Sequence, residues 1–113
     1  MSEPHVARGE VWWVSLDPTQ GAEIKKTRPC VVLTHETLNQ LRRTVVVIPL
    51  STAAKPHPPI TVPVSCHGQP AVAVIDQIRA VAKHRLKSKL EAMTTNDLAV
   101  ISRAISTILE IRF

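Results

Sequence analysis

Short apolar runs recur along the chain up to residue 81, and turn-favouring residues bound each run. The runs are rich in valine, isoleucine and tryptophan, which favour strands over helices. Pro63 lacks the N–H that a central strand donates, so its strand is expected at a sheet edge. The last run is either one long strand or two strands that meet near Asp76. The predicted strands cover residues 8–16, 30–34, 44–50, 60–64 and 71–81.

The hydrophobic period changes towards the C-terminus. Thr94 is placed as a helix N-cap, and Asp97 stands near the capping-box position. Apolar residues then follow at helical spacing, and they are Leu98, Ile101, Ile105 and Ile108. The basic segment 83–90 predicts a short turn or helix. Short strands followed by one helix indicate a small, curved antiparallel sheet that is barrel-like and capped by the helix.

Length and composition fit a single domain. The chain has 113 residues, 44% of them hydrophobic, so residues 1–113 are expected to form one domain with its own core. Residues 1–7 are expected to be a flexible N-terminal extension. No segment approaches the roughly 18 apolar residues of a membrane helix, and no signal region is recognised. We therefore expect a cytoplasmic protein with no membrane contact.

The potential metal ligands show no site-like spacing. The two cysteines, Cys30 and Cys66, have no CxxC spacing, and the five histidines form no ligand set. Cys30 lies within an apolar run and is expected in the core. The sequence therefore predicts neither a metal site nor another cofactor.

The charge balance favours an anionic partner. Fourteen lysines and arginines oppose nine acidic residues, which gives a formal charge of +5 and a pI of about 9.8. Between Glu36 and Glu91 the only acidic residue is Asp76. Nucleic acid is the usual partner of such a surface.

Several motifs stand in a specific order along the chain. They are RGEVWWVSLDPTQG, an Arg-Pro pair, a Ser-Thr pair after the third predicted strand, and Asp-Gln-x-Arg within AVAVIDQIRAVAKHRL. From about Arg8 to its end, the chain resembles the MazF/PemK toxins of bacterial toxin–antitoxin systems. The resemblance implies a mainly β fold with helices, namely an SH3-like, partly open antiparallel barrel of CcdB/PemK type with a C-terminal helix. It also implies a homodimer and a cognate MazE-like antitoxin with a disordered tail, commonly acidic, that suits a basic toxin.

The same resemblance implies a sequence-specific endoribonuclease that cleaves single-stranded mRNA without metal and so inhibits translation and growth. RNA carries its own nucleophile, the 2′-hydroxyl. The protein then has to help remove its proton, stabilise charge on the phosphate and assist departure of the 5′ oxygen. The expected products are a 2′,3′-cyclic phosphate, or the 3′-phosphate from its hydrolysis, and a 5′-hydroxyl end.

Arg28 matches the catalytic arginine of this family. Its planar guanidinium can hold two phosphate oxygens, and its high pKa favours charge stabilisation over proton donation. Pro29 limits its movement by restricting the backbone. Ser51 matches the family's catalytic hydroxyl, and Thr52 follows it as a second candidate. Both hydroxyls would also serve to cap a turn.

Two carboxylates are candidates for the general base. Asp76 stands where some relatives use an aspartate, but surrounding cations would keep it ionised, and a structural ion pair is the alternative. The PemK branch has an arginine where this chain has Val74, so its acid–base pair does not carry over whole. Glu23 matches a first-loop glutamate that would act as base or as a salt-bridge partner. If Asp76 is only structural, His35 and His57 are further candidates.

A second group of residues is expected to bind RNA. Lysines before the second strand would contact the phosphate backbone without reading sequence. The predicted RNA-binding residues are Lys25, Lys26, Thr27, Gln77 and Arg79. Trp12 and Trp13 are adjacent in a strand, so at most one would face a ligand, and packing in the core or a dimer interface is the expected role of both.

Two other functions remain open at the level of sequence. CcdB gyrase poisons resemble this fold, but they act through a C-terminal tail ending in Trp-Gly-Ile, whereas this chain ends in Ile111-Arg112-Phe113. A non-catalytic nucleic-acid-binding module is the other alternative. The intact set of arginine, hydroxyl and aspartate favours the nuclease over both.

Overall fold

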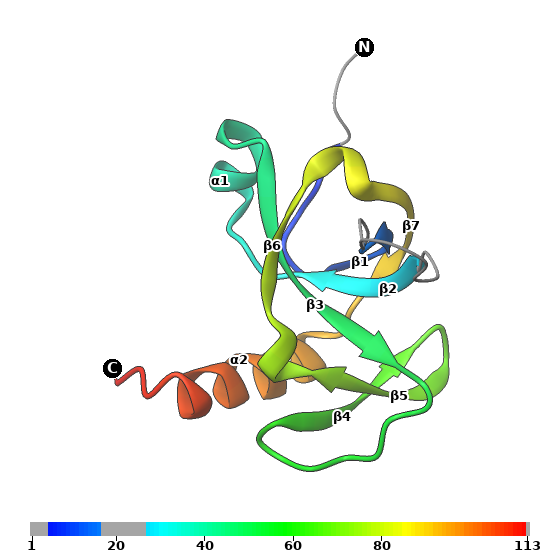
Figure 1. Ribbon diagram of the computed structural model, residues 1–113, viewed down its shortest axis with the longest axis vertical. Helices are drawn as coiled ribbons and strands as arrows, with labels where there is room; N and C mark the ends of the chain where they lie inside the picture. The colour runs from blue at the N-terminus through cyan, green and yellow to red at the C-terminus, as the bar shows by residue number, and fades with distance from the viewer. Residues whose placement is uncertain (1–4, 17–26, 113) are drawn as a thin grey trace, which may run out of the picture.

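The computed structural model describes residues 5–16 and 27–112, which form seven strands and two α-helices (Figure 1). Two short 3₁₀ turns, η1 and η2, flank the sixth strand. The elements are β1 (Glu10–Ser15), β2 (Thr27–Val32), α1 (Glu36–Leu41), β3 (Thr44–Ser51), β4 (Thr61–Cys66), β5 (Gln69–Val74), η1 (Ile75–Gln77), β6 (Arg79–Ala82), η2 (Lys83–Arg85), β7 (Leu86–Ala92) and α2 (Thr95–Ile108).

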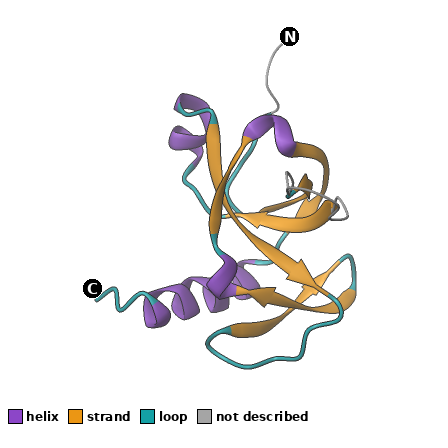
Figure 2. Cartoon of the chain, viewed as in Figure 1, coloured by secondary structure: helices purple, strands orange, loops and turns teal. Residues whose placement is uncertain are grey.

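The strands form one antiparallel sheet in the order β4-β5-β3-β2-β1-β7. β3 is the shared strand, because its first half pairs with β6 and its last two residues pair with β5. The described strands show no pairing between β6 and β7, so the barrel is partly open (Figure 2). β4 lies at an edge of the sheet, as Pro63 predicts. The fold that the resemblance implies is confirmed.

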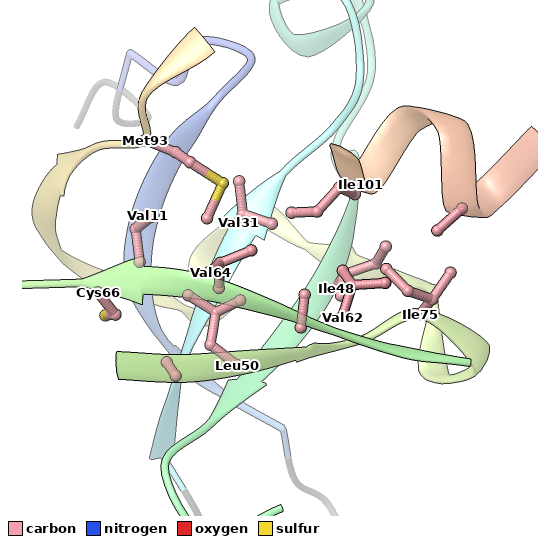
Figure 3. Close-up of a cluster of buried hydrophobic side chains, with 13 residues drawn as sticks. Val11, Val31, Ile48, Leu50, Val62, Val64, Cys66, Ile75, Met93 and Ile101 are labelled. Carbon is pink, nitrogen blue, oxygen red and sulfur yellow. The ribbon is translucent and has the colours of Figure 1, made fainter. Parts of the chain in front are cut away.

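The central strands are buried on both faces, which explains their nearly continuous apolar runs. Val11 and Trp12 are neighbours in β1, yet they belong to different clusters, because successive strand side chains point to opposite faces. The first cluster joins the sheet to the β4–β5 hairpin and α2 (Figure 3). The second cluster joins β1, β2, β3, β6 and β7, and it contains Cys30, which is fully buried as predicted.

Helix α2 begins as the sequence predicts. The Thr94 hydroxyl accepts a hydrogen bond from the Asp97 backbone N–H at 3.2 Å. The Asp97 carboxylate in turn accepts one from the Ser65 N–H at 2.9 Å, which ties the helix start to β4. Ile101 and Ala104 are buried against the first cluster. The predicted N-cap and apolar stripe are therefore both confirmed.

Gly9 is required where β1 begins. Its φ is +90°, a conformation that other residues rarely adopt, and an added Cβ would lie 3.2 Å from the Leu98 side chain. Its N–H donates to the Val32 carbonyl at 2.7 Å, and its carbonyl accepts from the Met93 N–H at 2.8 Å. Gly9 thus lets the backbone pass close to α2.

One predicted element is wrong. The segment 83–90 forms a 3₁₀ turn at η2, as one alternative predicts, but then continues as β7 rather than as a helix. The reason is tertiary: Leu86 is buried and pairs with Val14 of β1, while Lys87 and Lys89 remain exposed. Pairing with a neighbouring strand overrides the local preference of lysine-rich sequence. The run 71–81 resolves into two strands that meet at η1.

No pattern in the sequence predicts α1, which packs the N-terminal segment onto the barrel. Asn39 of α1 is buried, and its amide donates to the carbonyls of Val6, at 3.2 Å, and Thr34, at 2.9 Å. Val6 is itself buried in the second cluster. Val6 is thus packed against the barrel, whereas residues 1–4 of the expected N-terminal extension lie outside the described residues.

Candidate active site

Arg28 and Ser51 lie next to each other where the pairing of β2 and β3 ends. Cys30 of β2 and Pro49 of β3 are the last residues paired at this end. In an antiparallel pair, the residue two positions before one of them lies beside the residue two positions after the other. Those positions are Arg28, at the start of β2, and Ser51, at the end of β3. The fold thus brings together two predicted catalytic residues that are distant in sequence.

Two neighbouring hollows share Arg28, Leu50 and Ser51 in their walls. The first hollow, of about 430 Å³, is also lined by Trp13, Thr27, Pro29, Thr52 and Ala53. The second hollow, of about 270 Å³, is also lined by Leu16, Pro49, Ala54, Val74 and Gln77. Among the described residues that line either hollow, Arg28 alone carries a charge.

The Ser51 hydroxyl is oriented by the turn that follows it. Its oxygen accepts hydrogen bonds from the N–H groups of Ala53, at 3.2 Å, and Ala54, at 3.1 Å. The turn-capping role considered for this residue is therefore present. It also has a chemical consequence, because a hydroxyl has two acceptor lone pairs and one proton. With both acceptor positions engaged, the remaining capacity of Ser51 is to donate that proton.

Arg28 is partly buried at the start of β2. Its Cα pairs with Val14 of β1, and Cys30, two residues on, shares its face. Burial raises the pKa of the Cys30 thiol to about 12, although the positive charges of Arg79 and Arg28 partly oppose this rise. Both arginines therefore lie within electrostatic reach of one thiol. In the described part of the chain, no carboxylate forms an ion pair with Arg28.

The remaining described candidates divide into two groups. Thr27 and Thr52 line the first hollow, and Gln77 lines the second. Asp76, the preceding residue in η1, is exposed and lines neither hollow. No described side chain forms an ion pair with it, so the structural ion pair considered for Asp76 is not seen among these residues. Arg79 is exposed on β6 and is placed only by its effect on Cys30.

Three candidates fall outside the described residues, and two histidines lie away from both hollows. Glu23, Lys25 and Lys26 fall outside the described residues, in the connection that leads into Thr27. His35 caps α1, where its Nδ1 accepts from the Thr37 N–H at 3.0 Å. His57 stands in an exposed connection. Neither histidine lines a hollow, so neither is brought to Arg28.

Trp13 belongs to the site, although packing was the role expected of it. Its side chain is 38% exposed and lines the first hollow, whereas Trp12 is 8% exposed and belongs to the second cluster. The alternation of strand side chains is the signal that separates the two. That signal shows that they face opposite sides, but not which side meets the site.

No three His, Cys, Asp or Glu side chains of residues 5–16 and 27–112 gather as a metal-binding group. Along the same residues, no helix is long and apolar enough to cross a membrane. What the site offers is a guanidinium, a donating hydroxyl and an amide around two hollows. That set suits a phosphate group, because all three donate hydrogen bonds and one carries positive charge.

Residues 7–109 match the model of a family described as the PemK-like, MazF-like toxin of type II toxin–antitoxin systems. The chain belongs to this family. It is 30% identical over 118 residues to the endoribonuclease MazF9 of Mycobacterium tuberculosis (strain ATCC 25618 / H37Rv), covering 92% of this chain and 96% of that protein. A 45-residue match to the endoribonuclease PemK of Escherichia coli is 47% identical and covers 40% of this chain and 34% of PemK.

The fold of the family is also seen in crystals. A MazE–MazF crystal structure from Deinococcus radiodurans (Form-II) superposes with a TM-score of 0.84 at 22% identity, covering 97% of this chain and 100% of that chain. At this identity the likeness shows a shared MazF fold.

Proposed function

We propose that this protein is the endoribonuclease toxin of a type II toxin–antitoxin system and cleaves single-stranded RNA at the Arg28–Ser51 site. The observation that carries the proposal is that Arg28 and Ser51 both line the two neighbouring hollows, at the end of the pairing between β2 and β3. The relatives named above as endoribonucleases support the activity. Cleavage of mRNA would stop translation and growth.

The reaction begins with the substrate's own 2′-hydroxyl. Its oxygen attacks the neighbouring phosphorus as a base takes its proton, and the bond from phosphorus to the 5′ oxygen breaks. The 5′ oxygen takes up a proton, which leaves a 2′,3′-cyclic phosphate and a 5′-hydroxyl. Water can then open the cyclic phosphate to a 3′-phosphate.

Each site residue has a separate task in this reaction. Arg28 binds two non-bridging oxygens and stabilises the charge that develops on them. Ser51 donates its hydroxyl proton in a hydrogen bond to the same phosphate, because its acceptor positions are already engaged. These groups need no metal ion to stabilise the phosphate. Gln77 and Thr52 provide further donors at the rims of the hollows.

Two carboxylates, Asp76 and Glu23, are the candidates for the general base. Asp76 lines neither hollow, whereas Glu23 stands four positions before Thr27 in the chain. We assign Glu23 as base, with Asp76 as part of the surrounding charge. Glu23→Gln should remove the acid limb of the pH–rate profile, while Asp76→Asn should keep it. Loss of that limb in Asp76→Asn alone would reverse the assignment.

Three cations and one hydroxyl are assigned to the RNA backbone. We assign backbone contacts to Lys25, Lys26, Thr27 and Arg79, which position RNA without reading its sequence. A further cation stands nearby, because Arg85 donates to the Ser15 carbonyl at 3.3 Å and Ser15 pairs with Thr27. Binding through such contacts should weaken steeply with salt.

The proposal extends to partners and location. The MazE–MazF crystal structure supports a cognate antitoxin of the MazE kind for this chain. A disordered acidic tail on that antitoxin would neutralise the +5 surface as it folds. We further propose a homodimer of single-domain subunits, acting in the cytoplasm where mRNA is translated.

The direct test uses purified protein, a long mixed-sequence single-stranded RNA and excess EDTA. The expected result is a set of discrete fragments whose 5′ ends accept phosphate from a kinase without prior phosphatase treatment. Fragments with 5′-phosphate ends would contradict the 2′-hydroxyl mechanism. Intact RNA, across several unrelated RNAs and with folded protein, would favour the gyrase-poison or binding-module functions instead.

A further inference from the structure

Trp13 is exposed at the active site, and its role in the reaction is open. Trp12, the other tryptophan of the chain, is held in the second cluster, and its indole N–H donates to the Glu10 carboxylate at 3.1 Å. Trp13 points to the opposite face and is 38% exposed. Single exposed apolar side chains are common, so exposure alone indicates nothing. The informative observation is where this indole lies.

Trp13 forms the aromatic wall of the first hollow. Its Cα pairs directly with Pro29 of β2, the residue that follows Arg28. Two residues earlier in β1, Val11 is fully buried on the same face in the first cluster. The packing that buries this face of β1 therefore ends between Val11 and Trp13. Beyond that point the indole borders the hollow.

The lining of the first hollow combines two kinds of residue. Trp13, Pro29 and Leu50 are apolar, whereas Arg28 is cationic and Ser51 carries a hydroxyl. Its volume of about 430 Å³ lies in the range of ligand pockets, about 300–1,000 Å³. A nucleotide has a similar combination, since it joins a flat base to an anionic phosphate through a sugar. The lining of the hollow thus matches the apolar and anionic parts of one nucleotide.

We propose that Trp13 stacks on the base of a nucleotide adjoining the scissile phosphate while Arg28 and Ser51 hold that phosphate. The inference rests on the ribonuclease function proposed above. Stacking tolerates any base, because every base has a π-face. Trp13 is therefore a positioning residue: it holds the ribose so that the 2′ oxygen lies in line with the bond that breaks.

The proposal predicts a specific loss of RNA affinity. Stacking of one base on an aromatic side chain corresponds to about 5- to 150-fold in binding. Trp13→Leu keeps an apolar side chain but removes the stacking surface, so it should weaken RNA binding by that factor. Trp13→Phe should recover much of it. The matched control is Leu41→Ala, which removes an exposed apolar side chain near the other end of β3 and should change nothing.

The first measurement is tryptophan emission during titration with an RNA that cannot be cleaved. The RNA contains a sequence cut by the wild type, with 2′-deoxyribose at the cleaved nucleotide. The wild type should lose emission as RNA binds, because a stacked base quenches an indole. Trp13→Phe retains only the buried Trp12 and should lose little. Equal quenching in both proteins would overturn the proposal.

The second measurement identifies the stacked base. Abasic nucleotides are placed one at a time on either side of the scissile bond, and dissociation constants are measured for the wild type and Trp13→Leu. At the stacked position, removing the base should weaken binding to the wild type but not further to Trp13→Leu. If removing the base and removing the indole raise the dissociation constant by independent factors at every position, the base and the indole do not interact, and the proposal fails.

Two other occupants give different outcomes. If the hollow receives an antitoxin side chain instead, Trp13→Leu weakens antitoxin binding and leaves RNA affinity unchanged. If it is covered by a second copy, Trp13→Leu changes the mass in solution and leaves RNA affinity per dimer unchanged. Both outcomes overturn the stacking role while the wild type still cleaves RNA. A wild type that cleaves no RNA would instead refute the proposed function itself.

Discussion

Replacing Ser51 tests whether its hydroxyl only caps the turn or also acts in catalysis. Ser51→Ala removes the oxygen that accepts from the N–H groups of Ala53 and Ala54. Each such bond contributes about 0.5–1.5 kcal/mol net, and water can replace Ser51 more readily at Ala53, which is exposed, than at Ala54, which is partly buried. We expect the free energy of unfolding to fall by about 1 kcal/mol, which lowers Tm by about 4 °C for a chain of this length.

The effect on catalysis should be larger. Loss of one preorganised donor to a developing oxyanion typically lowers kcat by about 10²- to 10³-fold, or about 2.7–4 kcal/mol. Ser51→Thr keeps the oxygen and its proton, so both stability and kcat should stay near the wild-type values. Thr107→Ala is the control, because this hydroxyl lies in α2 and lines neither hollow, so its kcat should stay at the wild-type value.

The assay is single-turnover cleavage of a mapped RNA, with thermal unfolding of each variant measured alongside. A Ser51→Ala protein that unfolds earlier but cleaves at the wild-type rate would show that Ser51 only caps the turn. A loss of cleavage in Ser51→Thr as large as that in Ser51→Ala would also refute a role that depends on the hydroxyl.

Three further predictions concern the frame that holds the site. Gly9→Ala should lower the free energy of unfolding by about 1–3 kcal/mol in urea titration, because a positive φ and a Cβ 3.2 Å from Leu98 are both unfavourable; an unchanged midpoint would contradict this. Asn39→Ala should cost about 2–4 kcal/mol in the same assay, since it leaves two carbonyls without their donor, and a loss below 1 kcal/mol would mean that water replaces the amide. Burial alone would raise the pKa of Glu10, but hydrogen bonds and the charge of Lys89 outweigh it and lower that pKa below 4.5. The Glu10 carboxylate therefore stabilises the fold above about pH 4.5, and this contribution is lost as the pH falls below that value. Glu10→Gln should flatten the acid side of the curve of stability against pH. Parallel curves for the wild type and the variant would refute this.

The sequence predicts most of the sheet because its signals are local. Valine-rich runs and turn residues mark β1 to β5, and Pro63 identifies the edge strand. Thr94 and the apolar stripe behind it mark α2 in the same way. These patterns depend on neighbouring residues only, so they can be read without knowledge of the packing.

The sequence fails to predict elements whose structure depends on tertiary contacts. The lysines of β7 favour no strand by themselves, and that strand exists because Leu86 is buried beside β1. The short α1 carries too few apolar residues for a periodic signal, yet its Asn39 is buried and holds the N-terminal segment. Both features depend on partners that are distant in sequence.

The candidate site shows the same division. Arg28 and Ser51 are identified from motifs, and the register of β2 and β3 then brings them together. Asp76 follows the same motif logic, but its position in η1 leaves it outside both hollows. Trp13 lies within the motif RGEVWWVSLDPTQG, but the motif does not separate it from Trp12, and only the burial of neighbouring residues in β1 places it at the site. A motif thus identifies a residue type, whereas the fold decides which residues meet.

The central claim is that Arg28 stabilises the phosphate during RNA cleavage, and one comparison tests it most directly. Single-turnover rates are measured for the wild type, Arg28→Ala, Arg28→Lys and the control Arg42→Ala, an exposed arginine beyond the other end of β3. We predict a fall of about 10²- to 10³-fold for Arg28→Ala, partial recovery for Arg28→Lys because an ammonium cannot hold two oxygens in a fixed plane, and no change for Arg42→Ala. A folded Arg28→Ala protein that cleaves RNA at the wild-type rate would contradict the account.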